Sequence, residues 1–493
     1  MSDVIVIGGG LAGLAACVAL AQTGVTVTLL ESRPRLGGRA SSFEDLTTGE
    51  LIDNCQHVAM GCCTNFRHFC RVTGIEASFR RERELFFVAP PTLTTNTPPD
   101  VCRFSAIPLP APLHLTAAFL RLSYLTLREK LALARGLKAL ARQRPETAQR
   151  MNFAEWLAEH RQPANVVERF WWVVLVSALS ESLDRVSVAA ARKVFVDGFL
   201  ANRHGWEVWL PTLPLDELYS GQLTEWLTSH RVEVRLKSGV ERLVLENDHV
   251  VAVDLRNGEC LSAKQFVAAV PHQRLCSLLP GAWHNQPPFN LIDQLESAPI
   301  ASVHLWFDRP ITELPHAVLV GRLSQWMFNR SKVPSPQFPA PRENGTTRNS
   351  QLETRNYYQV VISNAREAAE RSQEQVIAEV VAELKGIWPE ANAAKLLHSR
   401  MIVEHTAVFS PRPRSEDLRP AQQSPIANLQ LAGDWTQTGW PATMEGAVRS
   451  GFLAAENIAR SFGRETPILQ PDLPVSWLTR WWIGSRETFG CDG

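Results

Sequence analysis

Apolar and polar positions follow a regular order at the start of the chain. The apolar run Val4–Ile7 leads directly into a glycine-rich turn, Gly8–Gly13, and the apolar pattern of a helix, Leu11–Gln22, begins inside that turn. A second apolar run, Val25–Leu30, follows. Short apolar runs bounded by turn residues predict buried strands, so these residues predict a strand, a tight turn, a helix and a second strand.

The next part of the chain has apolar residues at helical spacing. Leu113–Leu140 predicts a leucine-rich, cationic hairpin or one long helix, and Phe153–Phe199 predicts a largely helical region. From Arg231 onward the apolar residues alternate instead, which indicates strands. Strands are expected at 232–236, 240–245, 251–255 and 266–270. The first three predict a β-meander, and the fourth predicts a return to a parallel sheet.

The last third of the chain mixes strands and helices. Further strands are expected within 296–330 and at 357–363, separated by a polar loop at 332–356 that we expect to be mobile. A helix is expected at Glu367–Ile387. The final unit, residues 428–451, predicts a strand that ends in the carboxylate Asp434, then a loop, and then a helix beginning near Thr443.

The opening turn has the spacing Gly-x-Gly-x-x-Gly, which is typical of a dinucleotide site. Gly8 permits the tight turn, Gly10 lets the backbone approach a pyrophosphate, and Gly13 lets the helix pack closely on the strand. The free amides of the helix N-terminus favour that anion. Glu31 ends the second apolar run 18 residues after Gly13 and is placed to accept hydrogen bonds from ribose hydroxyls.

Two further segments extend this site. Gly37 and Gly38 free the backbone near a phosphate, and Arg39 can neutralise its charge. At the far end of the chain, Asp434 can bond a ribityl hydroxyl or approach the pyrophosphate. The amides that begin the last helix at Thr443 can stabilise negative charge on a flavin carbonyl.

Composition narrows the possible partners. The 493 residues carry 50 basic and 50 acidic side chains, so no basic field favours nucleic acid. The nine cysteines lack paired zinc-type spacing, and we expect reduced thiols and no metal. The first residues leave no room for a signal peptide, which favours a cytoplasmic protein. Fifteen tryptophans indicate a broad aromatic surface, in a pocket, on a membrane face or both.

The two cofactor motifs together resemble the flavin amine oxidase and phytoene desaturase superfamily. Within it the chain is most similar to the hydroxysqualene dehydroxylases, also called squalene-associated FAD-dependent desaturases. The segments that carry the resemblance are Asp53–Val58, the tract from Phe170 to Ala190, and Gly433–Thr443. The chain departs from the family at Cys55, where glycine is usual before Gln-His.

The resemblance implies FAD as the cofactor and an amine oxidase-like α/β fold. A Rossmann-like FAD-binding domain with a β-meander would comprise residues 1–72, 206–285 and 428–463. A substrate domain of mixed sheet and helices would comprise 73–205 and 286–427, and 464–493 would form an amphipathic tail. The residues assigned to the cofactor are Gly8, Gly10, Leu11, Ala12, Gly13, Glu31, Ser32, Arg33, Gly38, Arg39, Val240, Gly433, Asp434, Thr443 and Met444.

The resemblance also implies a reaction, the reduction of hydroxysqualene to squalene in squalene or hopanoid biosynthesis. An acid would protonate the allylic hydroxyl, and N5 of reduced FAD would deliver hydride to the resulting cation. His57 is the candidate acid, with Gln56 to orient it or the alcohol; Asp53 and the pair Glu404–His405 are reserve candidates. A packing role for His57 is the alternative.

Other activities fit the same scaffold, because a fold does not fix a reaction. The alternatives are a carotenoid or phytoene-type desaturase, an amine oxidase, and a non-catalytic isoprenoid carrier. Only one dinucleotide fingerprint is present, so we expect the electrons to come from an external donor, either NAD(P)H or a reductase.

Two segments predict contact with the inner face of a membrane. Trp477, Leu478, Trp481 and Trp482 share one helical face near the C-terminus, which suits either a helix lying in the headgroup layer or a face packed on the protein. The cationic stretch Leu113–Leu140 is the second candidate. A water-insoluble isoprenoid substrate would be collected there.

Overall fold

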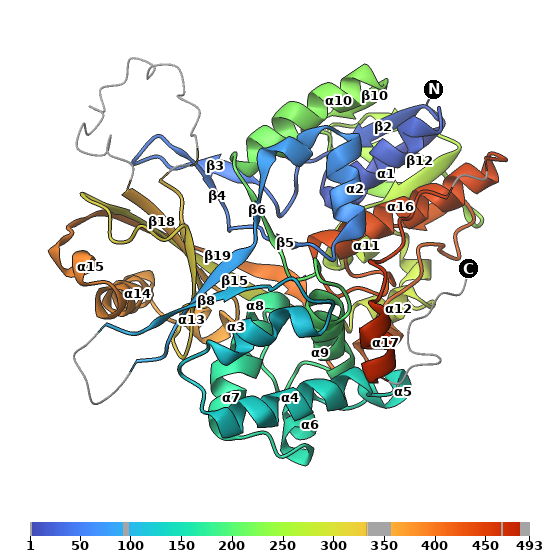
Figure 1. Ribbon diagram of the computed structural model, residues 1–493. Helices are drawn as coiled ribbons and strands as arrows, with labels where there is room; N and C mark the ends of the chain where they lie inside the picture. The colour runs from blue at the N-terminus through green and yellow to red at the C-terminus, as the bar shows by residue number, and fades with distance from the viewer. Residues whose placement is uncertain (1, 92–97, 332, 334–355, 465–466, 484–493) are drawn as a thin grey trace.

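The fold was analysed in a computed structural model that describes residues 2–91, 98–331, 333, 356–464 and 467–483 (Figure 1). A five-stranded parallel sheet carries the glycine-rich turn. Its order is β10-β2-β1-β14-β20. The strands are β10 (Val232–Arg235), β2 (Val27–Leu30), β1 (Val4–Ile7), β14 (Gln265–Ala268) and β20 (Leu429–Leu431). The strands predicted at both ends of the chain are therefore confirmed and lie in one sheet.

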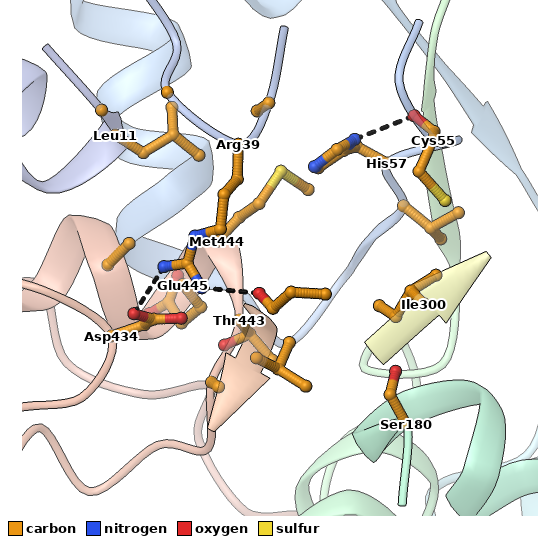
Figure 2. Close-up of a pocket in the computed structure, with 18 of the residues that line it drawn as sticks. Leu11, Arg39, Cys55, His57, Ser180, Ile300, Asp434, Thr443, Met444 and Glu445 are labelled. Atoms are coloured by element: carbon orange, nitrogen blue, oxygen red, sulfur yellow. Dashed lines mark hydrogen bonds and ion pairs between the residues drawn. The ribbon is translucent and has the colours of Figure 1, made fainter. Parts of the chain in front are cut away.

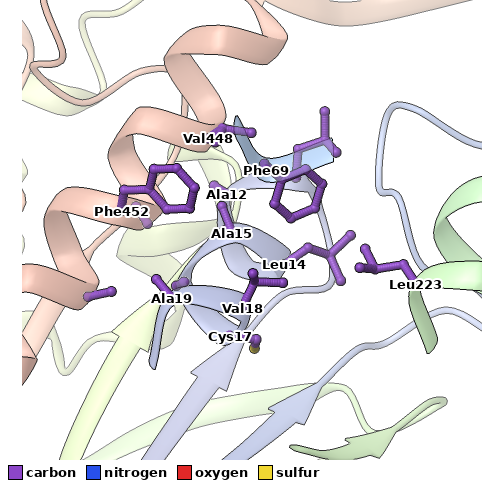
Figure 3. Close-up of a cluster of buried hydrophobic side chains, with 14 of the residues drawn as sticks. Ala12, Leu14, Ala15, Cys17, Val18, Ala19, Phe69, Leu223, Val448 and Phe452 are labelled. Atoms are coloured by element: carbon purple, nitrogen blue, oxygen red, sulfur yellow. The ribbon is translucent and has the colours of Figure 1, made fainter. Parts of the chain in front are cut away.

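Helix α1 (Leu11–Gln22) follows β1 with the predicted bounds and is buried on nearly every side. It packs against α16 (Met444–Ser461), so the first and last helices of the cofactor motifs are neighbours (Figure 3). The contact is close because Gly451 has no side chain: a Cβ there would lie 2.2 Å from the carbonyl oxygen of Ala12. Phe452 and Val448 complete this apolar cluster with Ala12 and Ala15.

The predicted β-meander is wrong in its first strand. The strand predicted at 232–236 is β10, which pairs in parallel with β2 at the edge of the five-stranded sheet. The antiparallel sheet consists instead of β11 (Val240–Glu246), β12 (His249–Leu255) and the short β13 (Cys260–Leu261). Alternation shows that a segment is extended, but it does not show which neighbour it pairs with. Here β10 covers the exposed edge of β2.

A seven-stranded sheet lies beside this domain, in the order β19-β15-β18-β17-β16-β7-β8. The strands expected within 296–330 and at 357–363 are confirmed as β15, β16, β17 and β18. Their neighbours are β7, β8 and β19. The bounds are β7 (Glu84–Val88), β8 (Val101–Ser105), β15 (Ser297–Phe307), β16 (His316–Leu319), β17 (Trp326–Asn329), β18 (Asn356–Ile362) and β19 (Leu396–Phe409). The loop predicted at 332–356 falls almost entirely outside the described residues.

The helix predicted at Glu367–Ile387 is two helices, α13 (Arg366–Glu370) and α14 (Gln373–Ile387). Ser372 separates them because its side chain caps α14 by accepting a hydrogen bond from the amide of Gln375. Helix α14 buries Val376, Val380 and Leu384 in the apolar cluster of the seven-stranded sheet. The short α15 (Pro389–Ala393) follows it.

A helical lobe covers the lower part of the molecule in Figure 1. The stretch predicted as a hairpin or one long helix is divided into α3 (Thr116–Leu120) and α4 (Leu127–Ala141), because Thr126 begins α4 with a capping box completed by Glu129. The region 153–199 is largely helical, as predicted. It contains α6 (Phe153–Glu159), α7 (Ala164–Val166), α8 (Val173–Leu179) and α9 (Val188–Phe195), with π-helical turns at Val167–Trp172 and Val196–Leu200.

The remaining elements join these parts. They include the hairpin β3 (Ser42–Glu44) and β4 (Leu51–Asp53), the sheet of β5 (Ala59–Met60), β9 (Val208–Pro211) and β6 (Phe79–Glu82), and the helices α2 (Thr64–Val72), α5 (Pro145–Ala148), α10 (Leu223–Ser229), α11 (His272–Leu278), α12 (Phe289–Ile292) and α17 (Trp477–Ile483). Within the described part of the chain, no helix combines the length and apolar character needed to span a bilayer.

Candidate active site

One large cavity of about 700 Å³ lies between the parallel sheet, the seven-stranded sheet and the helical lobe. Its walls include Gly8 and Gly10 of the first turn, Gly433 and Asp434 of the last, and His57 between them. Figure 2 shows Arg39, Asp434 and Thr443 on one side of this space and His57, Cys55 and Ile300 on the other. The two ends of the chain therefore contribute to one site.

The three glycines of the first turn have different surroundings. Gly8 has φ +108°, and a Cβ there would lie 2.4 Å from the carbonyl oxygen of Ala269. A Cβ at Gly13 would lie 1.9 Å from the carbonyl oxygen of Gly8, so Gly13 serves the packing of the helix and does not line the cavity. At Gly10 the nearest atom to an added Cβ is 4.0 Å away. The space beside Gly10 belongs to the cavity.

Helix α1 begins at this open position without a side-chain cap, so its first amides face the cavity unpartnered by a cap. Leu11 and Ala12, assigned to the cofactor from the sequence, line the cavity there. Free amides and the helix dipole together attract an anionic group. This end of the cavity is suited to a pyrophosphate.

Glu31 is 6% exposed and fixes the shape of the turn. One carboxylate oxygen accepts a hydrogen bond of 2.7 Å from the amide of Gly9, and the other accepts bonds from the amide of Arg33 and the hydroxyl of Ser32. Glu31, Ser32 and Arg33 all line the cavity. The carboxylate thus braces two loops, and its remaining lone pairs face the space where a ribose would bind.

Arg39 does not stand free for a phosphate. One guanidinium nitrogen donates to Asp434 at 2.7 Å, and another donates to the carbonyl oxygen of Ala407. Asp434 is 5% exposed, whereas the Arg39 side chain keeps 38% of its surface accessible. This ion pair joins the two cofactor motifs across the cavity, and the accessible part of Arg39 still contributes positive charge.

Thr443 begins α16 and caps it, accepting a hydrogen bond of 3.1 Å from the amide of Gly446. Met444 and Glu445 follow it on the cavity wall. Glu445 is fully buried and accepts hydrogen bonds from the amides of Asn65 and Phe66, so it caps the start of α2. Burial raises the pKa of this carboxyl. The second motif therefore also holds α2 in place.

His57 lies on the opposite wall (Figure 2). Its Nδ1 is 3.0 Å from the carbonyl oxygen of Cys55, and because a carbonyl only accepts, Nδ1 carries the hydrogen. Burial lowers the pKa of the imidazole below its usual range. The neutral ring then has its lone pair on Nε2, which points toward Arg39 and Met444 in Figure 2. In this state His57 is a proton acceptor.

Asp53 does not reach the cavity. It is 2% exposed, and its carboxylate accepts hydrogen bonds from Arg330, from the hydroxyl of Ser42 and from the amide of Leu215. Gln56 does line the cavity, but its side-chain oxygen accepts a 2.6 Å hydrogen bond from Arg330. Both residues therefore help to hold the loop that carries His57. This contact suits the orienting role expected of Gln56, and the reserve role of Asp53 as an acid stays a prediction.

Arg330 was not identified from the sequence as a residue of the site. It follows β17 and binds both Asp53 and Gln56, although it is only 6% exposed. A single arginine at the end of an apolar run resembles many surface arginines, so a single sequence offers no signal for this contact. Of the reserve pair, Glu404 lines the cavity from β19 and His405 is exposed.

A family model described as flavin containing amine oxidoreductase matches residues 11–459. The chain belongs to this family. The 15-cis-phytoene desaturase of Synechococcus elongatus is 28% identical over 471 residues, covering 92% of this chain and 95% of that protein. The zeta-carotene desaturase of Arabidopsis thaliana is 24% identical over 504 residues, covering 96% and 88%. The flavin containing amine oxidoreductase fold is thus present along almost the whole chain.

Solved structures show the same fold. An oxidoreductase from Methanosarcina mazei superposes with a TM-score of 0.68 at 16% identity and covers 93% of this chain and 99% of its own. Cyclohexylamine oxidase from Brevibacterium oxydans gives 0.66 at 18% identity, covering 94% and 100%. Their sequences are too distant for more than a fold comparison.

As a flavin containing amine oxidoreductase, the protein is an FAD-dependent oxidoreductase. The cavity wall fits this cofactor. It presents open space at Gly10, then the uncapped backbone amides of Leu11 and Ala12, and then the carboxylate of Glu31. Val240 and Gly38, also assigned to the cofactor, line the same part of the cavity. Beyond Thr443 and His57 the cavity continues into the helical lobe.

That inner part of the cavity is mainly apolar. Aromatic side chains from β7, β17, the π-helical turn after α9 and the segment before β9 line it, together with aliphatic residues of α8, β16 and β18. They are Phe87, Trp206, Phe199, Trp326, Phe328, Val173, Val174, Val318 and Val361. In the cavity as a whole, four tryptophans are among the lining residues: Trp206, Trp326, Trp435 and Trp440. An apolar compartment next to a flavin site accommodates a hydrocarbon.

Proposed function

We propose that this FAD-dependent oxidoreductase acts on a long isoprenoid and introduces a double bond into it, as a carotenoid-type desaturase. Support comes from the apolar inner compartment and from the desaturases that the chain resembles along most of its length. The observation that carries the direction of the reaction is the state of His57. A neutral imidazole with its lone pair toward the cavity accepts a proton.

Desaturation removes a hydride from one carbon and a proton from its neighbour, leaving a carbon–carbon double bond. Bound FAD supplies the hydride acceptor. His57 Nε2 takes the proton, and its Nδ1–H stays bonded to the carbonyl oxygen of Cys55, which keeps the ring in this tautomer. The loop of His57 is fixed by Arg330 through Gln56, so the base is held at one place on the wall. The apolar lining excludes water from the reacting carbons.

A second candidate is the reduction of hydroxysqualene to squalene, favoured by the segments Asp53–Val58 and Gly433–Thr443 of the sequence. In that direction His57 has to be protonated before the reaction, and burial makes the imidazolium a strong acid toward a hydroxyl leaving group. The reaction also requires a group that binds the hydroxyl. In both directions the second redox partner is an external molecule: an electron acceptor for desaturation, or NAD(P)H or a reductase for reduction.

Two anaerobic reactions separate these candidates. In the first, the oxidised holoenzyme is mixed with phytoene, and loss of the flavin absorbance together with a newly desaturated product supports the proposal. In the second, the photoreduced holoenzyme is mixed with hydroxysqualene, and flavin reoxidation with formation of squalene supports the second candidate instead. A primary amine that bleaches the flavin where both isoprenoids fail would indicate an amine oxidase. Protein purified without FAD would favour a carrier.

We further infer that the helical lobe contacts an anionic membrane, from which such a substrate is collected. Leu120, Leu127 and Leu131 are 56%, 66% and 56% exposed. Lys130 holds them together by donating a 2.7 Å hydrogen bond to the carbonyl oxygen of Leu120, which joins the end of α3 to the first turns of α4. Exposed arginines stand beside these leucines: Arg121, Arg128 and Arg135. Apolar residues with flanking cations suit the headgroup layer of anionic lipids.

Helix α17 is a second part of the proposed membrane surface, but fewer of its tryptophans are exposed than the sequence predicted. Trp477 and Trp481 are 71% and 76% exposed. Trp482, predicted to share their surface, is half-buried: Lys138 of α4 lies over its ring at 5.9 Å, and Arg142 donates to its carbonyl oxygen. Because α17 is fixed to α4 in this way, the two exposed tryptophans belong to the same lobe as the leucine surface.

A further inference from the structure

Six hydroxyl side chains line the cavity, and the state of each decides whether it is free for a ligand. Four are engaged within the protein. Ser32 donates to Glu31, Ser177 to the carbonyl oxygen of Val173, Ser238 to that of Leu236, and Thr443 to that of Pro441. The hydroxyls of Ser180 and Ser363 make no hydrogen bond to any residue that the structure describes.

Ser180 ends helix α8 and is 4% exposed. Its backbone has φ +56°, the left-handed conformation with which many helices end. The next residue fixes this conformation: Glu181 is fully buried and accepts hydrogen bonds from Arg366 and from the hydroxyl of Ser410. In Figure 2 the Ser180 hydroxyl points toward Ile300, on the same wall as Cys55.

Ser363 reaches the same place from the sheet. It is 3% exposed and directly follows β18, whose last pair with β15 joins Ile362 to Ala301. The next position in this antiparallel register places Ser363 beside Ile300. Its amide donates to the side-chain oxygen of Gln325 at 2.6 Å, which fixes the backbone and leaves the side chain to the cavity. Ser180 and Ser363 therefore both flank Ile300.

We propose that Ser180 and Ser363 form a hydroxyl-binding subsite that selects an isoprenoid carrying an oxygen atom over a pure hydrocarbon. Each serine can donate to and accept from a substrate hydroxyl. A hydrocarbon leaves both unpaired in a compartment that is otherwise apolar, and an unpaired buried hydroxyl is unfavourable. The subsite rests on the proposed function only in that the ligand is an isoprenoid: a hydrocarbon such as phytoene would bind less tightly than an oxygenated substrate, and the hydroxyl of hydroxysqualene, the substrate of the second candidate, would be held here. The subsite proposal specifies which chemical group of the isoprenoid the protein recognises.

The test measures binding separately from turnover. The oxidised holoenzyme is titrated with hydroxysqualene and with squalene in the same detergent micelles, and binding is followed by the change in flavin absorbance. Ser180→Ala and Ser363→Ala are each expected to weaken binding of the alcohol roughly three- to tenfold and to leave squalene binding unchanged. Alanine keeps the Cβ atom, so the cost of the left-handed backbone at Ser180 is the same in wild type and variant.

Ser177→Ala is the matched control, because Ser177 lies on the same helix and lines the same cavity but its hydroxyl is already bonded to Val173. It should change neither affinity. Wild-type protein that binds the two ligands equally well, or serine variants that weaken both alike, would overturn the subsite while leaving the redox proposal intact. Alcohol selectivity without any turnover of phytoene or hydroxysqualene would overturn the proposed function and keep the subsite.

Discussion

Arg330 and Asp53 form a buried ion pair of 2.7 Å although 277 positions separate them in the chain. Their side chains are 6% and 1% exposed. Arg330 follows a strand of the seven-stranded sheet, and Asp53 ends the hairpin that leads to His57, so the pair joins the substrate side of the cavity to the loop of the proposed base. A mutation at Arg330 therefore affects both stability and the position of His57.

The first prediction concerns the strength of this pair. Asp53→Ala leaves the Arg330 charge buried without its partner and should lower the free energy of unfolding by about 3–5 kcal/mol. The double variant Asp53→Ala, Arg330→Met should lose less than the sum of the two single variants, because it removes both charges. Urea denaturation followed by tryptophan fluorescence measures all four proteins. Strictly additive losses would show that the two side chains do not interact.

The second prediction separates two glycines of the first turn. Gly10→Ala meets no atom of the protein closer than 4.0 Å, so it should leave the stability of the FAD-free protein unchanged and weaken FAD binding. Gly13→Ala places a Cβ 1.9 Å from the carbonyl oxygen of Gly8 and should destabilise the FAD-free protein itself. Thermal unfolding with and without FAD distinguishes the two effects. Equal destabilisation of the FAD-free forms would contradict the assignment.

The third prediction concerns His57 and pH. Replacing this base with glutamine should lower the rate of flavin reduction by about 10²- to 10⁴-fold while FAD stays bound. Because burial lowers the pKa of His57 below its usual value of about 6.5, the wild-type rate should be constant above that pH and fall on acidification, as Nε2 becomes protonated. The variant should lack this acid limb. A wild-type rate that instead rises on acidification would favour the reductive direction.

The same shift has a consequence for stability. The folded protein binds a proton at His57 less readily than the unfolded chain does, since the folded pKa is the lower one. The contribution of His57 to stability is therefore complete above about pH 6.5 and is lost as the pH falls below it. The difference in unfolding free energy between wild type and His57→Gln, measured at pH 7.5 and pH 5, should shrink at the lower pH.

The fourth prediction concerns the membrane. Leu127→Gln with Leu131→Gln, and separately Trp477→Ala with Trp481→Ala, should reduce sedimentation with vesicles rich in phosphatidylserine. High salt should reduce binding of the wild type as well, because arginines contribute to it. Leu236→Gln changes a leucine that is 39% exposed on the parallel-sheet side and serves as the control. Unchanged sedimentation of both double variants would refute the membrane surface.

The cofactor half of the site could be predicted because its signals are local. Gly8, Gly10 and Gly13 lie within six residues: Gly8 and Gly13 need their small size for contacts within the strand–turn–helix unit or with the adjacent strand, and Gly10 leaves open space at the cavity. Helix α1 has the predicted bounds for the same reason. Asp434 was found because it closely follows a short apolar strand, β20, and a loop then leads to the glycine-bearing helix α16.

The substrate half was less accessible to sequence reasoning because its contacts are long-range. Arg330 binds Asp53 and Gln56 from another sheet, and Ser363 meets Ile300 only through the pairing of β15 with β18. Hydrophobic periodicity identifies strands but not their partners, which also explains why β10 was placed in the meander and not beside β2. The role of Cys55 as the acceptor for His57 depends on its backbone carbonyl, which no side-chain motif reveals.

The contact between Gly451 and Ala12 has a consequence for the order of events during synthesis. The glycine-rich turn leaves the ribosome early, but Asp434 reaches Arg39, and α16 packs on α1, only after residues 434–461 have emerged as well. At typical elongation rates the early turn waits about 20–90 s for these partners. The flavin site is thus complete only once both cofactor motifs have been synthesised, and the yellow colour of the holoprotein reports that these two distant segments have met.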